Sequence, residues 1–426
     1  MSGPFSRTTC TSTWLRSTGR KWRSALSPPE RRATWSTTTT RNLLPPLGLG
    51  AIERIAIAHD YLTQRGGAER VVLSLVRAFP HAPLYTSLYE PAGTFPEFAR
   101  VDVRTSPLNL LALLRQRHRL ALPLLAPAFS RLRIAADVAV CSSSGWAHGA
   151  HVSGRKVVYC HAPARWLYQT SRYHGNAGLL PRAGLAALRL PLERWDRKAA
   201  EGASRYLANS TWIAHEIGRI YGIEAEVVHP PVAIEADGPR QPLAGIEPGY
   251  VLCVSRLLPY KNVGAVVTAF AQLSDERLVV VGAGPDEGRL RASGGRNVHF
   301  AGSVGDDELR WLYDHARCLV AASYEDFGLT PVEAAAFGKP TAALRFGGYL
   351  DTVREGETGV FFERPEPAEI AHGVRTLLAE AWDTAAIRRH ADSFSDEGFT
   401  RRMREIVEEE LAVAGGPHDV RTGSTI

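Results

Sequence analysis

Short apolar segments of strand length alternate with helical patterns along most of the chain. The first is Glu53–Ala58, and a helical pattern over Ala68–Phe79 follows it. The later candidate strands are Asp137–Cys141, Lys156–Cys160, Tyr206–Ala208, Glu226–Val228, Tyr250–Val254, Leu278–Gly282, Val298–Ala301, Cys318–Ala322, Pro340–Leu344 and Gly359–Phe362. A helix between consecutive strands is typical of a parallel sheet with helices on both faces, so an α/β fold is predicted.

A polar, proline-rich segment divides this pattern into two halves. It contains His229-Pro230-Pro231 and then Asp237–Pro242, a composition typical of linkers. The sequence therefore predicts two Rossmann-like, doubly wound domains, residues 53–232 and 236–390, that face each other across a cleft. In such sheets ligands bind beyond the carboxyl ends of the strands, so functional residues are expected in the loops there.

Residues 1–50 differ from the rest of the chain in composition and charge. They carry eight basic residues against one acidic residue, so the whole-chain net charge of +6 leaves the other residues at −1. The body is therefore almost neutral, and its charge gives no support to nucleic-acid binding. The tail is rich in Ser and Thr without hydrophobic periodicity, which predicts disorder. It resembles a transit peptide, but with 45 Arg and only 5 Lys in the chain we favour a wrongly chosen upstream start codon in a GC-rich genome.

Cysteine spacing and hydropathy exclude several classes of protein. The five cysteines are far apart and form no CxxC pair, which argues against a disulfide framework or a zinc site. No run of about 18 apolar residues is present, so a membrane-spanning helix is not expected. We expect a protein of the cytoplasm.

The loop after Tyr250–Val254 places two cations near the start of a predicted helix, Val263–Leu273. Lys261 precedes Asn262, the expected N-cap, although a cation at this end opposes the helix dipole. An anion between Lys261, Arg256 and the free backbone N–H groups would explain this placement, which favours a diphosphate site. The alternative is a solvated lysine beside a surface arginine.

Other loops at strand ends are rich in glycine and carboxylates. Gly282-Ala283-Gly284-Pro285 follows one strand, and Phe346-Gly347-Gly348 precedes a helix start. Thr330-Pro331-Val332-Glu333 has the pattern of a capping box, which alone would account for Glu333. It does not account for Glu325, or for Gly328, in the same loop.

Together these segments resemble the retaining, GT-B-fold glycosyltransferases of family 4 over roughly residues 53–412. Glu325 and Glu333 have the E-x7-E spacing of that family, and the SRL-x-P-x-KN segment runs from Ser255 to Asn262. The G-x-GP and GG loops also have counterparts here, and Gly66–Arg70 matches the GGAER loop. Tyr159–Arg165 is similar to the YxHxPxR segment of the subgroup with GDP-mannose-dependent mannosyltransferases.

The resemblance implies a role for each matched residue. Arg256 and Lys261 would hold the donor diphosphate, Glu333 the ribose hydroxyls and Glu325 the hydroxyls of the transferred sugar. His161 would lie beside the reacting centre, although a lone histidine at a strand end is more often a packed residue. Backbone and loop contacts to donor or acceptor would come from Gly66, Gly67, Ser255, Gly282, Gly284, Gly328, Leu329, Thr330, Gly347 and Gly348. Residues 391–414 would form a helix that crosses back to the first domain.

The resemblance implies hexosyl transfer from a nucleotide sugar, with no further cofactor, to a glycan or lipid-linked acceptor. No D-x-D triplet occurs, so we expect fixed cations rather than a metal ion to stabilise the leaving diphosphate. Glu325 is the only motif carboxylate available as a nucleophile, and the resemblance assigns it elsewhere, so front-face transfer with retention is expected.

Several alternatives stay open at this stage. GDP-mannose is the favoured donor, with a UDP-sugar as the alternative, and a non-catalytic GT-B binding domain is a further alternative. A nicotinamide-dependent oxidoreductase is disfavoured, because neither glycine loop has the full G-x-G-x-x-G pattern. Residues 107–134 are rich in leucine and arginine, which is compatible with peripheral attachment to the inner face of the cell membrane or with an ordinary core-facing helix. Pro123 and Pro127 are expected to break any long helix there.

Overall fold

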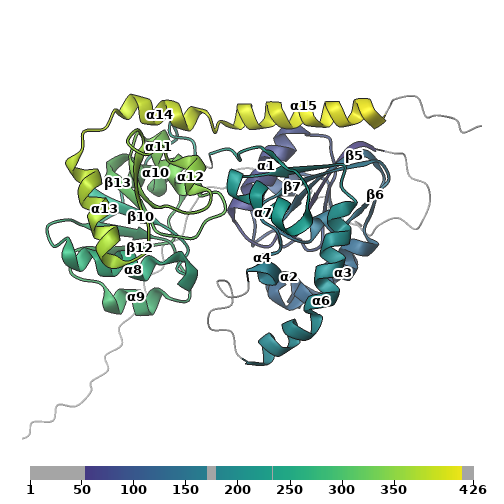
Figure 1. Ribbon diagram of the computed structural model, residues 1–426, viewed down its shortest axis with the longest axis horizontal. Coiled ribbons are helices and arrows are strands. Elements are labelled where there is room, and N and C mark those ends of the chain that lie inside the picture. Colours follow the sequence, from purple (N-terminus) through teal and green to yellow (C-terminus); the bar gives the residue numbers. More distant parts are fainter. Residues whose placement is uncertain (1–52, 170–178, 233, 415–426) are drawn as a thin grey trace, which may run out of the picture. The chain divides into compact units, whose positions relative to one another are not determined.

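The computed structural model describes residues 53–169, 179–232 and 234–414, and these form two lobes that each contain a parallel β-sheet (Figure 1). We call residues up to 232 the N-lobe and residues 234–392 the C-lobe. The tail, residues 1–50, and the end of the chain after Ala414 lie outside the described residues. The expectation of two doubly wound α/β domains is confirmed.

The N-lobe sheet has the strand order β3-β2-β1-β5-β7-β8-β9. Its strands are β1 (Glu53–His59), β2 (Leu84–Thr86), β3 (Val103–Thr105), β5 (Ala136–Ser143), β7 (Arg155–Cys160), β8 (Arg205–Ala208) and β9 (Glu226–Val227). A separate parallel pair consists of β4 (Arg133–Ile134) and β6 (His151–Val152). The sequence did not predict β2, β3, β4 or β6, because strands of two or three residues are too short to show a period.

The C-lobe sheet has the order β12-β11-β10-β13-β14-β15. Its strands are β10 (Tyr250–Val254), β11 (Leu278–Val281), β12 (Val298–Gly302), β13 (Ala316–Ala321), β14 (Thr341–Leu344) and β15 (Gly359–Phe362). In both sheets the chain begins at a central strand, extends to one side and then returns to the other side. The direction therefore reverses between β1 and β5 and again between β10 and β13, and such switch points are where α/β sheets bind ligands.

Helices cover these sheets (Figure 1). The N-lobe helices are α1 (Gly67–Ala78), α2 (Ala112–Gln116), α3 (Leu122–Arg131), α4 (Arg165–Tyr168), α6 (Leu179–Glu201) and α7 (Thr211–Tyr221). The C-lobe helices are α8 (Val263–Ala269), α9 (Glu287–Ser293), α10 (Asp306–His315), α11 (Leu329–Ala336), α12 (Tyr349–Thr352), α13 (Pro367–Ala379) and α14 (Thr384–Asp392). Helix α8 is shorter than predicted, because a 3₁₀ turn over Phe270–Gln272 replaces its last turn.

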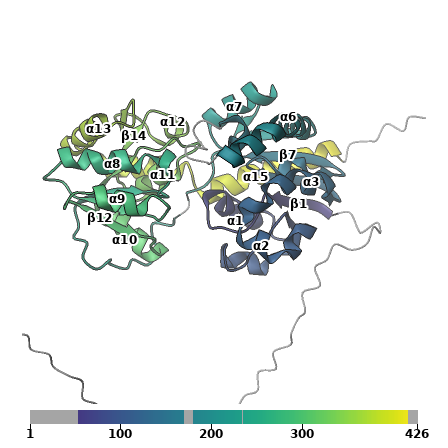
Figure 2. The same ribbon diagram turned by 90° about the horizontal axis from the view of Figure 1, so that it is seen from below.

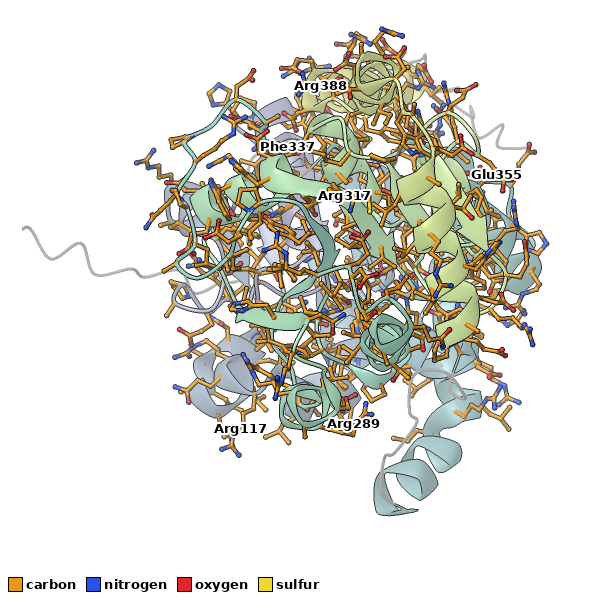
Figure 3. The ribbon with its side chains drawn as sticks, turned by 90° about the vertical axis from the view of Figure 1, so that its left-hand side faces the viewer. Arg117, Arg289, Arg317, Phe337, Glu355 and Arg388 are labelled. Atoms are coloured by element: carbon orange, nitrogen blue, oxygen red, sulfur yellow. The ribbon has the colours of Figure 1, made fainter. Side chains whose placement is uncertain are left out.

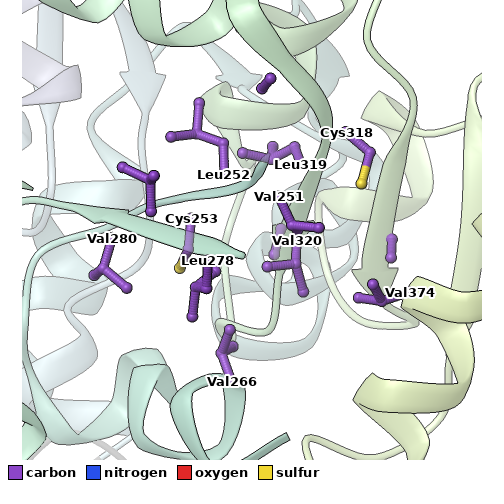
Figure 4. Close-up of a cluster of buried hydrophobic side chains, with 14 of the residues drawn as sticks. Val251, Leu252, Cys253, Val266, Leu278, Val280, Cys318, Leu319, Val320 and Val374 are labelled. Carbon is purple, nitrogen blue, oxygen red and sulfur yellow. The ribbon is translucent and has the colours of Figure 1, made fainter. Parts of the chain in front are cut away.

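Alternate residues of the N-lobe strands enter two different clusters of buried side chains. Ile57, Val140 and Tyr159 pack on the face that carries α1, whereas Ala58 and Cys141 pack on the opposite face. Because side chains alternate along a strand, burial on both faces requires the continuous apolar runs seen in the sequence. The C-lobe core is built in the same way, with Val251, Leu252 and Val320 between helices that contribute Val266 and Val374 (Figure 4).

The last helix, α15 (Asp396–Ala414), packs on the N-lobe although it follows the C-lobe in sequence. Its Phe399, Met403 and Ile406 join the cluster of buried residues on the α1 face. Arg77 of α1 also forms an ion pair with Asp396, at 2.7 Å. Figures 1 and 2 show α15 running beside α1.

Residues 107–134 form short helical pieces rather than one long helix. A 3₁₀ turn over Pro107–Leu110, α2, a 3₁₀ turn over His118–Ala121 and α3 follow one another. The expected break occurs, but not at both prolines, because Pro127 lies inside α3.

Candidate functional site

The loops that follow β10 and β13 meet at the C-lobe switch point. Lys261, at the end of the 3₁₀ turn Pro259–Lys261, forms an ion pair through Nζ with Oε1 of Glu325. Lys261 is only 7% exposed, so the alternative of a solvated lysine is wrong. The sequence predicted both residues as site residues but did not predict that they contact each other.

Burial and neighbouring charges act on both members of this pair. Burial lowers the pKa of Lys261, and the nearby Arg165 and Arg256 lower it further, although Glu325 opposes them. For Glu325, burial raises the pKa, but the attraction of Lys261, Arg165 and Arg256 outweighs it and the net shift is downward. Glu325 is therefore a carboxylate at neutral pH, and a local excess of positive charge surrounds it.

The two arginines that contribute to this excess come from different lobes. Arg256, on the β10 loop, is exposed, and its guanidinium lies 3.4 Å from the hydroxyl of Tyr260. Arg165, at the start of α4 in the N-lobe, forms an ion pair with Asp326, next to Glu325. Ser210 of the N-lobe also donates a hydrogen bond to the backbone oxygen of Asp326. The β13 loop is thus held by residues of both lobes.

Asn262 does not cap α8 with its side chain. Its backbone is left-handed, with φ of 55°. Its side-chain amide, through Nδ2, donates a hydrogen bond to the carbonyl oxygen of Ala322 at 2.8 Å. Ser323 donates in turn to the carbonyl oxygen of Lys261 at 3.1 Å. The predicted N-cap bond is therefore replaced by hydrogen bonds that join the loop carrying Lys261 to the loop carrying Glu325.

Glu333 lies deeper in α11 than the sequence pattern indicated. The helix begins after Gly328, which has left-handed backbone, so Thr330 lies inside the helix and the predicted capping box is absent. The carboxylate of Glu333 accepts a hydrogen bond from the hydroxyl of Tyr313 at 2.7 Å. Burial raises the pKa of Glu333, although the bond from Tyr313 and the charge of Arg70 oppose this.

The glycines at these strand ends allow loops to approach one another. A Cβ on Gly282 would lie 2.0 Å from the carbonyl oxygen of Ser255, and one on Gly284 would lie 2.2 Å from that of Leu257. Gly347 and Gly348 contact the backbone of the Glu325 loop in the same way. In the structure these glycines pack loop on loop, and their expected contact with a ligand stays a prediction.

The N-lobe switch point carries His161, which follows β7, and the loop before α1. The Nε2 atom of His161 lies 2.8 Å from the hydroxyl of Ser142. Burial lowers the pKa of His161 to about 3, and the positive charges of His59 and Arg165 act in the same direction. Gly66 precedes α1, and a Cβ on Gly67 would lie 3.0 Å from a methyl group of Leu329 of the C-lobe.

Sequence reasoning missed four polar residues of these switch points: His59, Ser142, Tyr313 and Asp326. Two of them, His59 and Ser142, lie at the carboxyl ends of β1 and β5, and the sheet register pairs them. A polar residue that ends an apolar strand was the available signal. Tyr313 gave no signal, because an aromatic residue in an amphipathic helix is typical of a core position.

No group of three or more His, Cys, Asp and Glu in the described part of the chain is placed to hold a metal ion. Of the helices described, none is long and apolar enough to cross a bilayer.

Comparison with known proteins first defines the class of fold. HepE from Anabaena, solved in complex with UDP and glucose, superposes with a TM-score of 0.61 at 18% identity, over 84% of this chain and 99% of that one. Sucrose-phosphate synthase from Thermosynechococcus elongatus gives 0.61 at 19% identity, over 85% and 100%. The chain has the GT-B fold.

Family models then match each lobe separately. The model described as Glycosyltransferase Family 4 matches residues 65–236, and the model described as Glycosyl transferases group 1 matches residues 239–394. The chain is thus like the GT-B glycosyltransferases of family 4 and group 1. These matches do not reach the mannosyltransferase subgroup, which stays a prediction.

Curated relatives match part of the chain. A D-inositol 3-phosphate glycosyltransferase of Streptomyces bingchenggensis is 34% identical over 208 residues, 42% of this chain and 46% of the relative. A glycogen synthase of Thermus thermophilus is 32% identical over 175 residues, 39% and 40% of the two chains. The matched segments therefore span less than half the length of either relative.

Proposed function

We propose that this protein transfers a hexose from a nucleoside diphosphate sugar to a hydroxyl of a glycan or lipid-linked acceptor. The observation that carries the proposal is the buried Lys261–Glu325 ion pair at the C-lobe switch point, with the exposed Arg256 on the same loop as Lys261. A diphosphate needs fixed positive charge, and a sugar needs carboxylate and backbone acceptors. This pair offers both within a few ångströms.

In this proposal Lys261 contacts the diphosphate while it remains paired with Glu325. Arg256 supplies a guanidinium that can bind two phosphate oxygens, and its exposed position leaves it accessible to a ligand. Glu325 then accepts hydrogen bonds from hydroxyls of the transferred sugar. Glu333 accepts from the ribose, a role supported by its carboxylate in the middle of α11, where Tyr313 occupies one oxygen.

We further propose that transfer proceeds with retention and without a metal ion. As the glycosidic bond breaks, negative charge grows on the diphosphate, and the preorganised charges of Lys261 and Arg256 stabilise it. Glu325 is paired with Lys261, which supports a binding role rather than attack on the anomeric carbon. A leaving phosphate oxygen would take the acceptor proton. Inversion at the anomeric carbon, an adduct trapped on Glu325, or loss of turnover in EDTA would each contradict part of this scheme.

Two nucleotide sugars have support as the donor. The Tyr159–Arg165 segment favours GDP-mannose, whereas a structural neighbour was solved with UDP-glucose, which favours a UDP-hexose. A thermal-shift panel of GDP- and UDP-sugars, with and without EDTA, separates them. We expect one nucleotide to raise the Tm and its sugar to be turned over. If neither nucleotide raises the Tm, the proposed function is wrong.

We also keep the proposal that the acceptor is reached at an anionic membrane surface. The segment from the turn Pro107–Leu110 through α3 exposes a group of leucines: Leu110, Leu111, Leu113, Leu120 and Leu124. Arg117 lies between them and points away from the protein (Figure 3). Apolar side chains interleaved with cations are typical of helices that lie on anionic lipid. Leu114 and Leu125 of the same segment are buried in the core, and Leu108 and Leu122 pack against it while partly exposed.

Cosedimentation tests the membrane proposal. Vesicles of anionic lipid at low salt should pellet the wild type, whereas neutral vesicles should not. Replacing Leu110, Leu111 and Leu113 by serine should abolish pelleting, while Leu188→Ser and Leu190→Ser on the exposed start of the described part of α6 should not. Equal binding by both sets of variants would contradict the assignment to this segment.

A further inference from the structure

A chain of buried polar residues runs from α1 to His161 on one face of the N-lobe sheet. His59 ends β1, Ser142 lies at the end of β5 and His161 follows β7. Alternation places all three on the α1 face, the face of Ile57, Val140 and Tyr159, and α1 contributes Glu69 from its first turn. Glu69, His59 and Ser142 are 0–2% exposed.

The distances link these groups in order. Oε1 of Glu69 lies 3.9 Å from Nε2 of His59. The Nδ1 atom of His59 lies 3.0 Å from the hydroxyl of Ser142 and 3.2 Å from its carbonyl oxygen. The same hydroxyl lies 2.8 Å from Nε2 of His161.

The acceptors around His59 determine where its protons are. Nδ1 faces a carbonyl oxygen and Nε2 faces a carboxylate, and a bare nitrogen lone pair would be repelled by either. Nδ1 therefore carries a proton, because it lies at hydrogen-bond distance from the Ser142 carbonyl oxygen. Nε2 lies only at ion-pair distance from Oε1 of Glu69, which also accepts a hydrogen bond from Gln64 at 3.0 Å. The Oε2 atom of Glu69 has no hydrogen-bond partner among the described residues, so this carboxylate favours a second proton on His59. Burial alone lowers the pKa of His59, but Glu69, Asp60 and the Ser142 carbonyl raise it above the usual value.

The direction of the hydrogen bond between Ser142 and His161 follows from the bonds that the Ser142 hydroxyl can make. Ser142 accepts from Nδ1 of His59, so its own proton is available for Nε2 of His161, the only other side-chain atom bonded to it in the described part of the chain. Nε2 of His161 then accepts and cannot carry a proton. Because His161 is neutral at physiological pH, its single ring proton must be on Nδ1.

We propose that Glu69, His59 and Ser142 are positioning residues that hold the proton of His161 on Nδ1. His161 then presents an N–H donor to an oxygen of the bound substrate and does not act as a general base. In water a neutral histidine prefers its proton on Nε2, so the chain reverses the intrinsic preference of the ring. The kinetic part of this inference rests on the proposed function, but the position of the proton does not.

The first test is nitrogen NMR of protein labelled with ¹⁵N-histidine, with the His161 resonances identified by their absence from His161→Gln. We expect protonated Nδ1 and unprotonated Nε2 between pH 5 and 8. The charged groups facing His161 are His59 and Arg165, and those facing His59 are Glu69 and Asp60. A wild-type His161 with its proton on Nε2 would overturn the proposal.

Ser142→Ala is the decisive variant, because it removes the donor to Nε2. We expect the His161 proton to move to Nε2 and kcat/KM to fall about 10-fold, the loss expected for one neutral hydrogen bond, with unchanged affinity for the free nucleotide. Ser143→Ala is the matched control: Ser143 is equally buried, and its hydroxyl bonds to His148 at 3.0 Å instead. It should leave the His161 resonances in place even if it lowers the Tm more.

The contribution of Glu69 is tested separately. Glu69→Gln removes a charge that raises the pKa of His59, so the ¹⁵N titration of His59 should move to lower pH. The proposed chain of positioning residues is wrong if the titration of His59 is unchanged in Glu69→Gln. It is also wrong if His161 keeps its wild-type tautomer in Ser142→Ala. If the tautomer results hold and no nucleotide sugar is turned over, the positioning chain stands and the proposed function fails.

Discussion

The ion pair between Lys261 and Glu325 leads to a prediction about stability. Removing one member of a buried pair costs about 3–5 kcal/mol of the free energy of unfolding, because the other charge is left without a partner. Lys261 is 7% exposed, whereas the Glu325 side chain is 22% exposed and partly hydrated. We therefore expect Glu325→Leu, which strands the buried ammonium, to cost about 3 kcal/mol, and Lys261→Met to cost about 1–2 kcal/mol.

The double variant should be more stable than Glu325→Leu alone. Apolar replacement of a whole buried pair is often close to neutral, so Lys261→Met with Glu325→Leu should cost at most about 1 kcal/mol. Urea unfolding at pH 7, followed by the tryptophan fluorescence of the whole chain, measures this double-mutant cycle. Lys339→Met is the control, because this half-buried lysine has no carboxylate at ion-pair distance in the described part of the chain.

Additive costs in the cycle would refute the reasoning, since they would mean that the two side chains do not interact in solution. Calorimetric titration with GDP and UDP then separates stability from binding. The double variant should be folded and yet bind the preferred nucleotide more weakly, because it keeps Arg256 but lacks Lys261, the other cation proposed to contact the diphosphate. Full nucleotide affinity in that variant would contradict the role proposed for Lys261.

Four further predictions concern single residues. Gly348→Ala would place a Cβ 2.2 Å from the backbone of Phe327 and should lower both the Tm and the nucleotide affinity. Gly288→Ala in α9 meets nothing within 4 Å, so this variant should raise the free energy of unfolding by about 0.5–1 kcal/mol in urea melts. Tyr313→Phe should cost about 1.5–3 kcal/mol by the same measurement and raise the pKa of Glu333 further, seen by carboxyl NMR. Because the pKa of His161 is lowered to about 3, its contribution to stability is lost as pH falls below about 6.5, so His161→Gln should flatten the decline in unfolding free energy between pH 6.5 and 4.

The sequence predicted the architecture because the central strands of both sheets are buried on both faces. That burial demands continuous apolar runs such as Tyr250–Val254, which the structure reproduces residue for residue. Strands β2 and β3 were not predicted, because a strand of three residues is too short to show alternation of apolar and polar side chains. The loops with Lys261 and Glu325 were found because a cation before a helix and an unexplained carboxylate both require a reason.

Local rules failed where tertiary contacts replaced them. Asn262 and Thr330 fit helix-capping patterns, but Asn262 bonds to Ala322 and Thr330 lies within α11. Capping rules describe a helix in isolation, whereas here the neighbouring loop offers Asn262 a buried carbonyl that must be satisfied. The partners of His161 were not predictable, because the register between β1 and β5 that pairs His59 with Ser142 has no local signature.

The two switch points use the same position in the topology in physically different ways. In the N-lobe the polar groups, His59 and Ser142, belong to the strands themselves and are buried, so the sheet register fixes their geometry before any ligand arrives. In the C-lobe Lys261 and Glu325 lie on loops beyond the strands and depend on loop-to-loop packing at glycines. Substitutions in the N-lobe chain should therefore change turnover with little effect on nucleotide affinity. Substitutions in the C-lobe loops should change both, because the same contacts that hold those loops together also present the charges that bind the donor.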